Sequence, residues 1–188
     1  MLSVPAIVLL VLVGLVGGVG LWLAAAYNGL VTLRQGVNNA WAQIEVQLKR
    51  RHDLIPNLVN MVKGYAAHEK DTLERVIAAR ARATSASLPA DVIKAEGELS
   101  SALARLLAVS ESYPELKANQ NFLSLQEELT STENRVAYAR QFYNDNVTKL
   151  NTRIQTLPTI VGAGTFEFRE ELFFEAPGEA KEAPKVQF

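Results

Sequence analysis

The stretch AIVLLVLVGLVGGVGLWLAAA, residues 6–26, is the feature from which the fold of this sequence can be worked out. Its 21 residues are apolar or small, and no charged side chain precedes Arg34. With a rise of 1.5 Å per residue, such a helix spans about 31 Å, the thickness of the hydrocarbon core of a bilayer. Trp22 and Tyr27 stand toward its end, where aromatic rings favour the membrane interface. We therefore expect residues 1–26 to form a transmembrane anchor.

A cleaved signal peptide is the alternative interpretation of this stretch. Signal peptides carry a basic n-region before a shorter apolar core and end in a small-residue cleavage site. Here the apolar run is longer, the basic n-region is missing, and no A-x-A site stands apart from the helix. These features favour an anchor that is retained.

Four glycines interrupt the predicted anchor, at positions 14, 17, 18 and 20. Glycine weakens a helix in water, but small residues are common where membrane helices pack closely. We predict that Gly14 and Gly18 contribute to self-association within the bilayer.

The basic residues near the anchor indicate its orientation. Arg34 and the run Lys49-Arg50-Arg51 follow the span, and nothing before it is charged except the amino terminus. The positive-inside rule then predicts a single-pass protein whose body lies in the cytoplasm.

The composition of the whole chain narrows the classes of function. The 188 residues carry a net charge of −1, which excludes the strongly basic surface typical of nucleic-acid binding. The absence of cysteine excludes disulfides, thiolate metal sites and a cysteine nucleophile. His52 and His68 leave little material for a metal centre or a histidine-based triad. We predict an assembly or interaction protein with no catalytic residue, no cofactor and no metal site.

From Tyr27 to Leu157 the apolar residues recur three and four positions apart, which is typical of helices that bury one face. The stripes are Val37, Trp41, Ile44 and Leu48; Ile55, Val59, Val62, Ala66, Leu73 and Val76; Leu99, Leu103 and Leu106; and Phe122, Leu125, Leu129, Val136, Ala139, Tyr143, Leu150, Ile154 and Leu157. We expect an all-α fold in which residues 27–157 form an antiparallel up-down four-helix bundle.

Proline and small polar residues mark the expected helix boundaries. Asp53 can cap a helix whose first turn contains Pro56, so we expect a boundary there; alternatively, Pro56 only kinks one long helix. The other predicted breaks are a loop at residues 84–89, the end of the third helix at residues 112–114, and a cap on the fourth helix at Asn119 or Asn121.

Two charged groups are interpreted as solvated surface rather than as sites. The basic run at residues 49–51 fits an exposed helix face. His68-Glu69 fits an exposed polar pair, because Thr72 stands where the H-E-x-x-H zinc motif needs its second histidine.

Several polar side chains fall on or beside the apolar stripes, and buried amides and phenols must find partners. We predict a core polar network of Asn39, Asn134, Tyr143 and Asn144, with Asn146 beside it, rather than a ligand site. Within it, Tyr143 is expected to donate a hydrogen bond inside the bundle.

Residues 158–188 form a tail rich in phenylalanine and proline. Residues 165–169 alternate as a strand does, so we expect an irregular or short-strand tail. Exposed phenylalanines mark contact sites. Either the tail folds back along its own bundle, or it packs on a neighbouring subunit and closes a homo-oligomer. The candidate self-association residues are Phe166, Phe168, Phe173 and Phe174.

Short strings in a fixed order add a resemblance to a known family. They are AWAQI (40–44), QLKRR (47–51), DLIPNLV (53–59), YPELKAN (113–119), LQEEL (125–129), TENR (132–135), FYND (142–145) and FEAP (174–177). Together they resemble the LemA family of bacterial membrane proteins. The resemblance implies one N-terminal membrane helix, an antiparallel four-helix bundle, and no known catalytic activity or cofactor. One branch of that family works in building magnetosome membranes, which implies membrane organisation. Relatives with a lipoprotein cysteine place the body outside the cytoplasm, an alternative orientation.

These observations together predict a membrane-anchored, non-enzymatic scaffold or assembly protein of the bacterial cell membrane. Its expected partners are the lipid bilayer, further copies of itself and a possible unknown membrane protein, but not nucleic acid. The alternative is an adaptor that presents client proteins to a membrane protease or a signalling enzyme.

Overall fold

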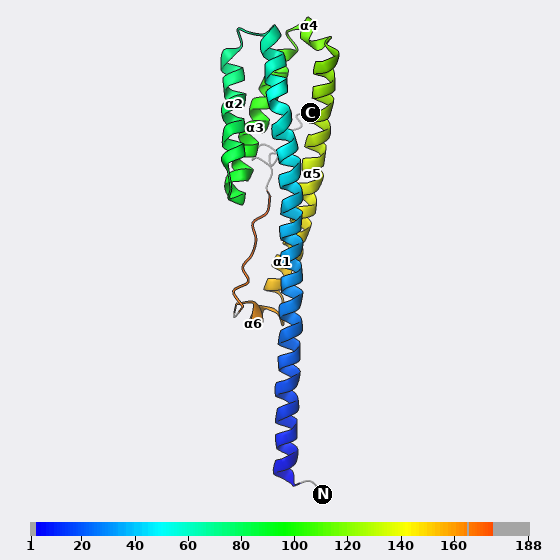
Figure 1. The fold of residues 1–188 in the computed structure, drawn as a ribbon. Coiled ribbons are helices and arrows are strands. Elements are labelled where there is room, and N and C mark those ends of the chain that lie inside the picture. The colour runs from blue at the N-terminus through cyan, green and yellow to red at the C-terminus, as the bar shows by residue number, and fades with distance from the viewer. Residues whose placement is uncertain (1–2, 165, 175–188) are drawn as a thin grey trace, which may run out of the picture. The chain divides into compact units, whose positions relative to one another are not determined.

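The computed structural model describes residues 3–164 and 166–174, and within these ranges the regular structure is entirely helical (Figure 1). The helices are α1 (Val4–Tyr65), α2 (Lys70–Ser85), α3 (Pro89–Ser110), α4 (Pro114–Lys117), α5 (Gln120–Gln155) and α6 (Ile160–Ala163). The all-α prediction is confirmed, whereas the up-down four-helix arrangement stays a prediction.

The chain divides into two compact units. The first consists of Met1–Ala40 and Asn144–Glu171, and the second consists of Trp41–Tyr143 and Leu172–Phe188. Helices α1 and α5 each contribute residues to both units.

The first unit contains the apolar N-terminal part of α1. An 18-residue window of this helix is long and apolar enough to cross a membrane, and none of it is buried. Further along, Leu30 and Val37 of α1 are buried, as are Val147 and Leu150 of α5. A Cβ atom on Gly36 would come within 3.1 Å of the Asn146 Oδ1 atom, so glycine permits a close approach of α1 and α5.

The second unit contains the main hydrophobic core. Helices α2 and α3 pack side by side within it (Figure 1). The core side chains include Ile55, Leu58, Val62, Leu73, Val76, Leu99, Leu103, Leu106, Leu116, Phe122 and Leu129. Each fully buried side chain of this size stabilises the fold by about 1.5–3 kcal/mol. The core therefore comes from one face of each helix, as the periodicity predicts.

Most of the predicted stripe residues are buried, and three are not. Trp41 and Leu125 are half-buried. Leu157 is 79% exposed because α5 ends at Gln155, two residues earlier.

The helix ends agree with the sequence-based boundaries except in one place. Helix α2 ends at Ser85 and α3 begins at Pro89, so the predicted loop is confirmed. The Asn119 Oδ1 atom accepts hydrogen bonds from the backbone N–H groups of Asn121 (2.9 Å) and Phe122 (3.3 Å). Asn119, not Asn121, therefore caps α5.

The predicted boundary at Pro56 is wrong, because α1 continues through it to Tyr65. Proline has no N–H, so the carbonyl oxygen of His52, four residues earlier, loses its helical partner. The Arg80 Nε–H of α2 donates to that oxygen at 2.8 Å. This bond replaces the missing one, and the chain turns instead at residues 66–69.

Candidate functional site

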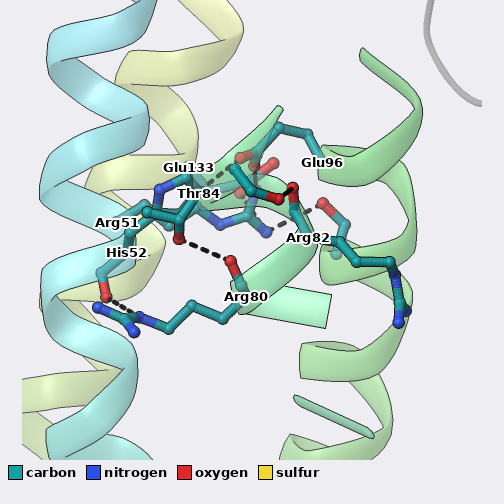
Figure 2. Close-up of polar contacts among 9 residues, drawn as sticks. Arg51, His52, Arg80, Arg82, Thr84, Glu96 and Glu133 are labelled. Atoms are coloured by element: carbon teal, nitrogen blue, oxygen red, sulfur yellow. Dashed lines mark hydrogen bonds and ion pairs between the residues drawn. The ribbon is translucent and has the colours of Figure 1, made fainter. Parts of the chain in front are cut away.

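Charged side chains from three helices of the second unit meet in what we call the buried charge cluster (Figure 2). It consists of Arg51 and His52 from α1, Glu96 from α3 and Glu133 from α5. Arg51, His52 and Glu96 are buried. Arg80 of α2 reaches the same part of α1 through its bond to the His52 carbonyl (Figure 2).

Glu96 is the most deeply buried member, with an exposed fraction of 0%. Its Oε2 atom accepts from Arg51 Nη1 at 3.1 Å, and its Oε1 atom accepts from His52 Nε2 at 2.6 Å. A carboxylate that has been removed from water must be neutralised and hydrogen-bonded. Arg51 and His52 therefore make the burial of Glu96 possible.

Arg51 connects the members of the cluster. Its Nη2 atom donates to Ser100 Oγ at 2.9 Å and lies 3.0 Å from Glu133 Oε2. Its Nε atom is buried and has no hydrogen-bond partner among the described residues. One guanidinium thus joins α1, α3 and α5.

Arg140 of α5 feels the electrostatic field of this cluster. Burial lowers the pKa of its guanidinium below its usual value, and the positive charge of Arg51 acts in the same direction. Glu133 and Glu96 oppose the shift. Arg140 thus belongs to the same charged neighbourhood, in which positive and negative groups alternate.

The contacts of the buried charge cluster hold α1, α3 and α5 together within the second unit. Its members donate to and accept from one another, and breaking a buried ion pair costs about 3–5 kcal/mol. Among residues 3–164 and 166–174, no three His, Asp or Glu side chains stand together in a way that would hold a metal ion. His68 is exposed, and half-buried Glu69 accepts from the Tyr113 hydroxyl at 3.4 Å.

The interpretation of the basic run as solvated surface is right for two of its three residues. Lys49 and Arg50 are exposed, but Arg51 is buried. The helical spacing contains the missing signal, since Arg51 follows Leu48 by three residues, which puts it on the buried stripe.

The same helical spacing locates Glu96, the buried carboxylate of the cluster. Glu96 precedes Leu99 by three residues and follows Val92 by four, so it also lies on an apolar stripe. At this position the helical spacing is therefore a better guide to burial than the charge of the side chain.

The structure places the four residues of the predicted core polar network at different depths. Tyr143 is buried, and its hydroxyl donates to the Leu172 carbonyl at 2.9 Å. Asn144 is half-buried, whereas Asn39 and Asn134 are exposed. Both exposed asparagines lie beside the buried stripes of α1 and α5 rather than on them, so their amides face water.

In the first unit, the tail packs on its own chain through aromatic rings. The rings of Phe166 and Phe168 meet the Tyr27 ring edge-on, with centroid distances of 5.1 and 5.8 Å. The Arg34 guanidinium lies 4.9 Å from the centre of the Phe168 ring. Such cation–π contacts add to the apolar contact area.

A polar contact fastens the same part of the tail. The Asn151 amide of α5 donates to the Glu171 carbonyl and accepts from the Glu171 N–H, both at 2.9 Å. An asparagine side chain thereby satisfies both backbone groups of an irregular segment.

In the second unit, Phe174 packs on its own chain through an aromatic and a cation–π contact. Its ring centroid lies 6.0 Å from that of Trp41, and the Arg140 guanidinium lies 4.5 Å from its centre. Trp41 also meets the Tyr143 ring edge-on at 5.4 Å.

These contacts agree with the alternative in which the tail folds back along its own chain, and the predicted role of the tail phenylalanines in self-association stays a prediction. Phe168 and Phe174 are 7% and 4% exposed and are used within their own chain. Phe166 is half-buried, and Phe173 is 44% exposed. Within the predicted tail, Ile160–Ala163 form α6, and residues 166–174 are irregular rather than a strand. Residues 165 and 175–188, among them Pro177, lie outside the described residues.

Gly14 and Gly18 lie in the apolar part of α1. A Cβ atom at either position would meet nothing within 4 Å. Their predicted role in self-association stays a prediction.

Comparison with known proteins gives consistent relatives. The model of the LemA family matches residues 40–188. Magnetosome protein MamQ 2 of Paramagnetospirillum magneticum and Magnetosome protein MamQ of Magnetospirillum gryphiswaldense are each 26% identical over 178 residues, covering 80% of this chain and 65% of the relative. Protein LemA of Metamycoplasma hominis is 23% identical over 150 residues, covering 79% of this chain and 68% of the relative.

This chain thus spans slightly less than two thirds of the length of the MamQ relatives. The apolar helix and these relatives fit a membrane-anchored bacterial protein. Since the family model covers most of the sequence, including the buried charge cluster and α5, the chain belongs to the LemA family.

Proposed function

We propose that this protein is a single-pass, membrane-anchored and non-enzymatic scaffold that associates with further copies of itself. The observation that carries the proposal is the continuity of α1, Val4–Tyr65. One helix contains both an exposed apolar stretch of membrane length and part of the main core. No linker separates the anchor from the packed helices, as suits a protein that organises a membrane surface.

The chemistry of the polar groups supports a structural role. The buried charge cluster holds three helices, and Tyr143 and Asn151 hold the tail. The MamQ relatives are named as magnetosome proteins. We extend to this chain the role in membrane organisation that the resemblance to this family implies.

The finer topology belongs to the same proposal. Arg34, Lys49 and Arg50 follow the apolar stretch, so we place the body in the cytoplasm by the positive-inside rule. We also propose that the C-terminal part of α1, together with α2, α3 and α5, forms an antiparallel up-down four-helix bundle.

Co-purification of two differently tagged full-length copies from bacterial membranes tests the function. We expect each tag to capture the other and native mass measurements in detergent to show a fixed number of subunits. A protein that stays monomeric at all concentrations would overturn the scaffold proposal. If monomers reproducibly co-purify with a membrane protease or a signalling enzyme, the scaffold proposal is wrong and the adaptor alternative is favoured.

A further inference from the structure

A groove of about 420 Å³ lies between α2 and α3, within the second unit. Arg75, Arg82, Arg105 and Glu98 supply its charged side chains, and small residues such as Ala102 leave space between them. Sites for small molecules typically enclose roughly 300–1,000 Å³. The groove is therefore large enough to receive a small polar molecule.

The direction of the two helices decides which charged residues face one another across this groove. Residues 86–88 alone join α2 to α3, and the two helices pack side by side in an antiparallel arrangement (Figure 1). The Arg82 Nε–H donates to Glu98 Oε2 at 2.9 Å, which fixes their register. Arg75 lies two helical turns before Arg82. Arg105 lies two turns after Glu98, so Arg75 and Arg105 occupy facing positions.

No described carboxylate neutralises this pair of like charges. Arg75 and Arg105 are exposed, and neither forms an ion pair with a described residue, whereas Arg82 is paired with Glu98. Residues 101–109, which lie within about one turn of Arg105 on α3, include no acid. Packed helices lie about 8–10 Å apart, so two long side chains on facing helices can reach one anion between them. Such an anion would remove the repulsion between the two arginines.

The chemistry of two facing guanidinium groups selects an oxyanion. A guanidinium presents a planar fork of N–H donors that matches the oxygen atoms of phosphate and carboxylate groups. The three arginines and one glutamate of the groove give it a net charge of +2. A phosphomonoester carries a charge of about −1.5 to −2 at pH 7 and offers three acceptor oxygens, so it balances the groove better than a single carboxylate does.

We propose that the groove between α2 and α3 binds a small molecule that carries a phosphomonoester, with Arg75 and Arg105 on either side of the phosphate. Arg82 keeps its pair with Glu98 and borders the same groove. The phosphate belongs either to a free molecule or to a lipid headgroup, and the experiment below distinguishes these sources.

The arginine side-chain signals of the isotope-labelled, full-length protein in detergent test the site by magnetic resonance. Addition of glycerol phosphate should shift the Nε–H signals of Arg75 and Arg105, whereas chloride at the same ionic strength should not. Arg75→Gln and Arg105→Gln each remove one charged donor, so each should weaken binding about tenfold. Arg50→Gln is the matched control, because Arg50 is exposed on α1 and is not part of the groove lining. It should leave the affinity unchanged.

A second pair of variants places a carboxylate where we expect the phosphate. Ala78 lines the groove three residues after Arg75, which is the spacing of neighbours on a helix surface. Ala78→Glu should neutralise part of the groove and weaken phosphate binding at least about tenfold. Ala81→Glu makes the same charge change at an exposed position of α2 outside the groove lining, so it should weaken binding less than about twofold. Circular dichroism of every variant shows whether the helices remain folded.

Two phosphomonoesters separate the possible sources of the ligand. Glycerol phosphate and dihexanoyl phosphatidic acid carry the same phosphate group, but only the second has acyl chains. A site for lipid headgroups should bind the phosphatidic acid at least about tenfold more tightly, and Arg105→Gln should abolish this difference. Equal affinities for the two compounds assign the site to a free molecule.

The inference is overturned if neither phosphomonoester shifts the Arg75 and Arg105 signals. It is also overturned if Arg105→Gln binds phosphate as tightly as Arg50→Gln, or Ala78→Glu as tightly as Ala81→Glu. None of these results changes the scaffold proposal, which depends on association between copies of the chain.

Discussion

A proline inside a helix leaves one carbonyl oxygen without its backbone donor, and here a side chain from another helix supplies the replacement. The Arg80 Nε–H group donates to the His52 oxygen that Pro56 cannot reach. At the scale of single residues, this bond explains why α1 has no break at Pro56.

We predict that Arg80→Met lowers the free energy of unfolding by about 1–3 kcal/mol, because it leaves an acceptor of a buried residue unpaired. In a Pro56→Ala background, the alanine N–H restores the helical bond, so the same substitution should cost less than half as much. Urea unfolding followed by circular dichroism in detergent measures both values.

Arg75→Met is the control, since Arg75 is exposed on the same helix and makes no hydrogen bond with a described residue. A cost for Arg80→Met that does not depend on the residue at position 56 would contradict this account of Pro56.

The charge cluster makes a second prediction at this scale. Glu96→Gln keeps the shape of the side chain but leaves Arg51 and His52 without their buried carboxylate, so we expect a loss of about 3 kcal/mol of stability. Glu98→Gln breaks the exposed pair with Arg82 and should cost less than about 1 kcal/mol. Equal losses in the two variants, measured by urea unfolding, would argue against a special role for the cluster.

At the scale of elements, the tail is held by a few side chains rather than by regular structure. Tyr27 and Arg34 contact Phe168 in the first unit, and Trp41 and Arg140 contact Phe174 in the second. An irregular segment of this kind is stable only while such contacts persist.

We predict that Phe168→Ala exposes the tail to proteolysis. Truncating a buried phenylalanine costs about 3–5 kcal/mol, which is more than enough to raise trypsin cleavage after exposed Arg169 at least about tenfold. Phe173→Ala, at an exposed position, should change the cleavage rate less than about twofold. Equal cleavage of the two variants would show that Phe168 does not hold the tail.

At the scale of the whole molecule, the apolar stretch of α1 determines where the protein resides. An 18-residue window of this stretch has no buried residue, and hydrocarbon is the solvent that suits such a surface. The family match begins at residue 40, so it concerns the body rather than this stretch.

We predict that replacing both Val13 and Val16 by lysine releases the protein from the membrane fraction. Each lysine near the centre of a span costs about 2.5–3.5 kcal/mol on insertion scales. Lysines at exposed Ala78 and Ala104 of the body should leave the protein in the membrane. Sedimentation after carbonate extraction gives the result, and a Val13/Val16 variant that still pellets would contradict the anchor.

Much of the fold could be predicted because it depends on local patterns. The periodicity located the buried faces that carry Ile44, Leu99 and Val136, and the turn chemistry placed the cap of α5 at Asn119 or Asn121, of which Asn119 is the one that caps it. The same patterns were insufficient at Pro56. Proline usually breaks a helix, but here a hydrogen bond from Arg80 on another helix satisfies the carbonyl that Pro56 leaves unpaired.

The amino-acid sequence by itself determined that the chain is helical, that its first part suits a membrane, and that its body buries one face of each helix. Only the tertiary structure decided the course of α1, the burial of Arg51 with Glu96, and the docking of the tail. The reason is physical: periodicity and hydrophobicity are properties of neighbouring residues, whereas a buried charge or an unpaired carbonyl is tolerated only when a partner arrives from far along the chain. Arg80 is 28 residues from His52, and Glu96 is 45 from Arg51.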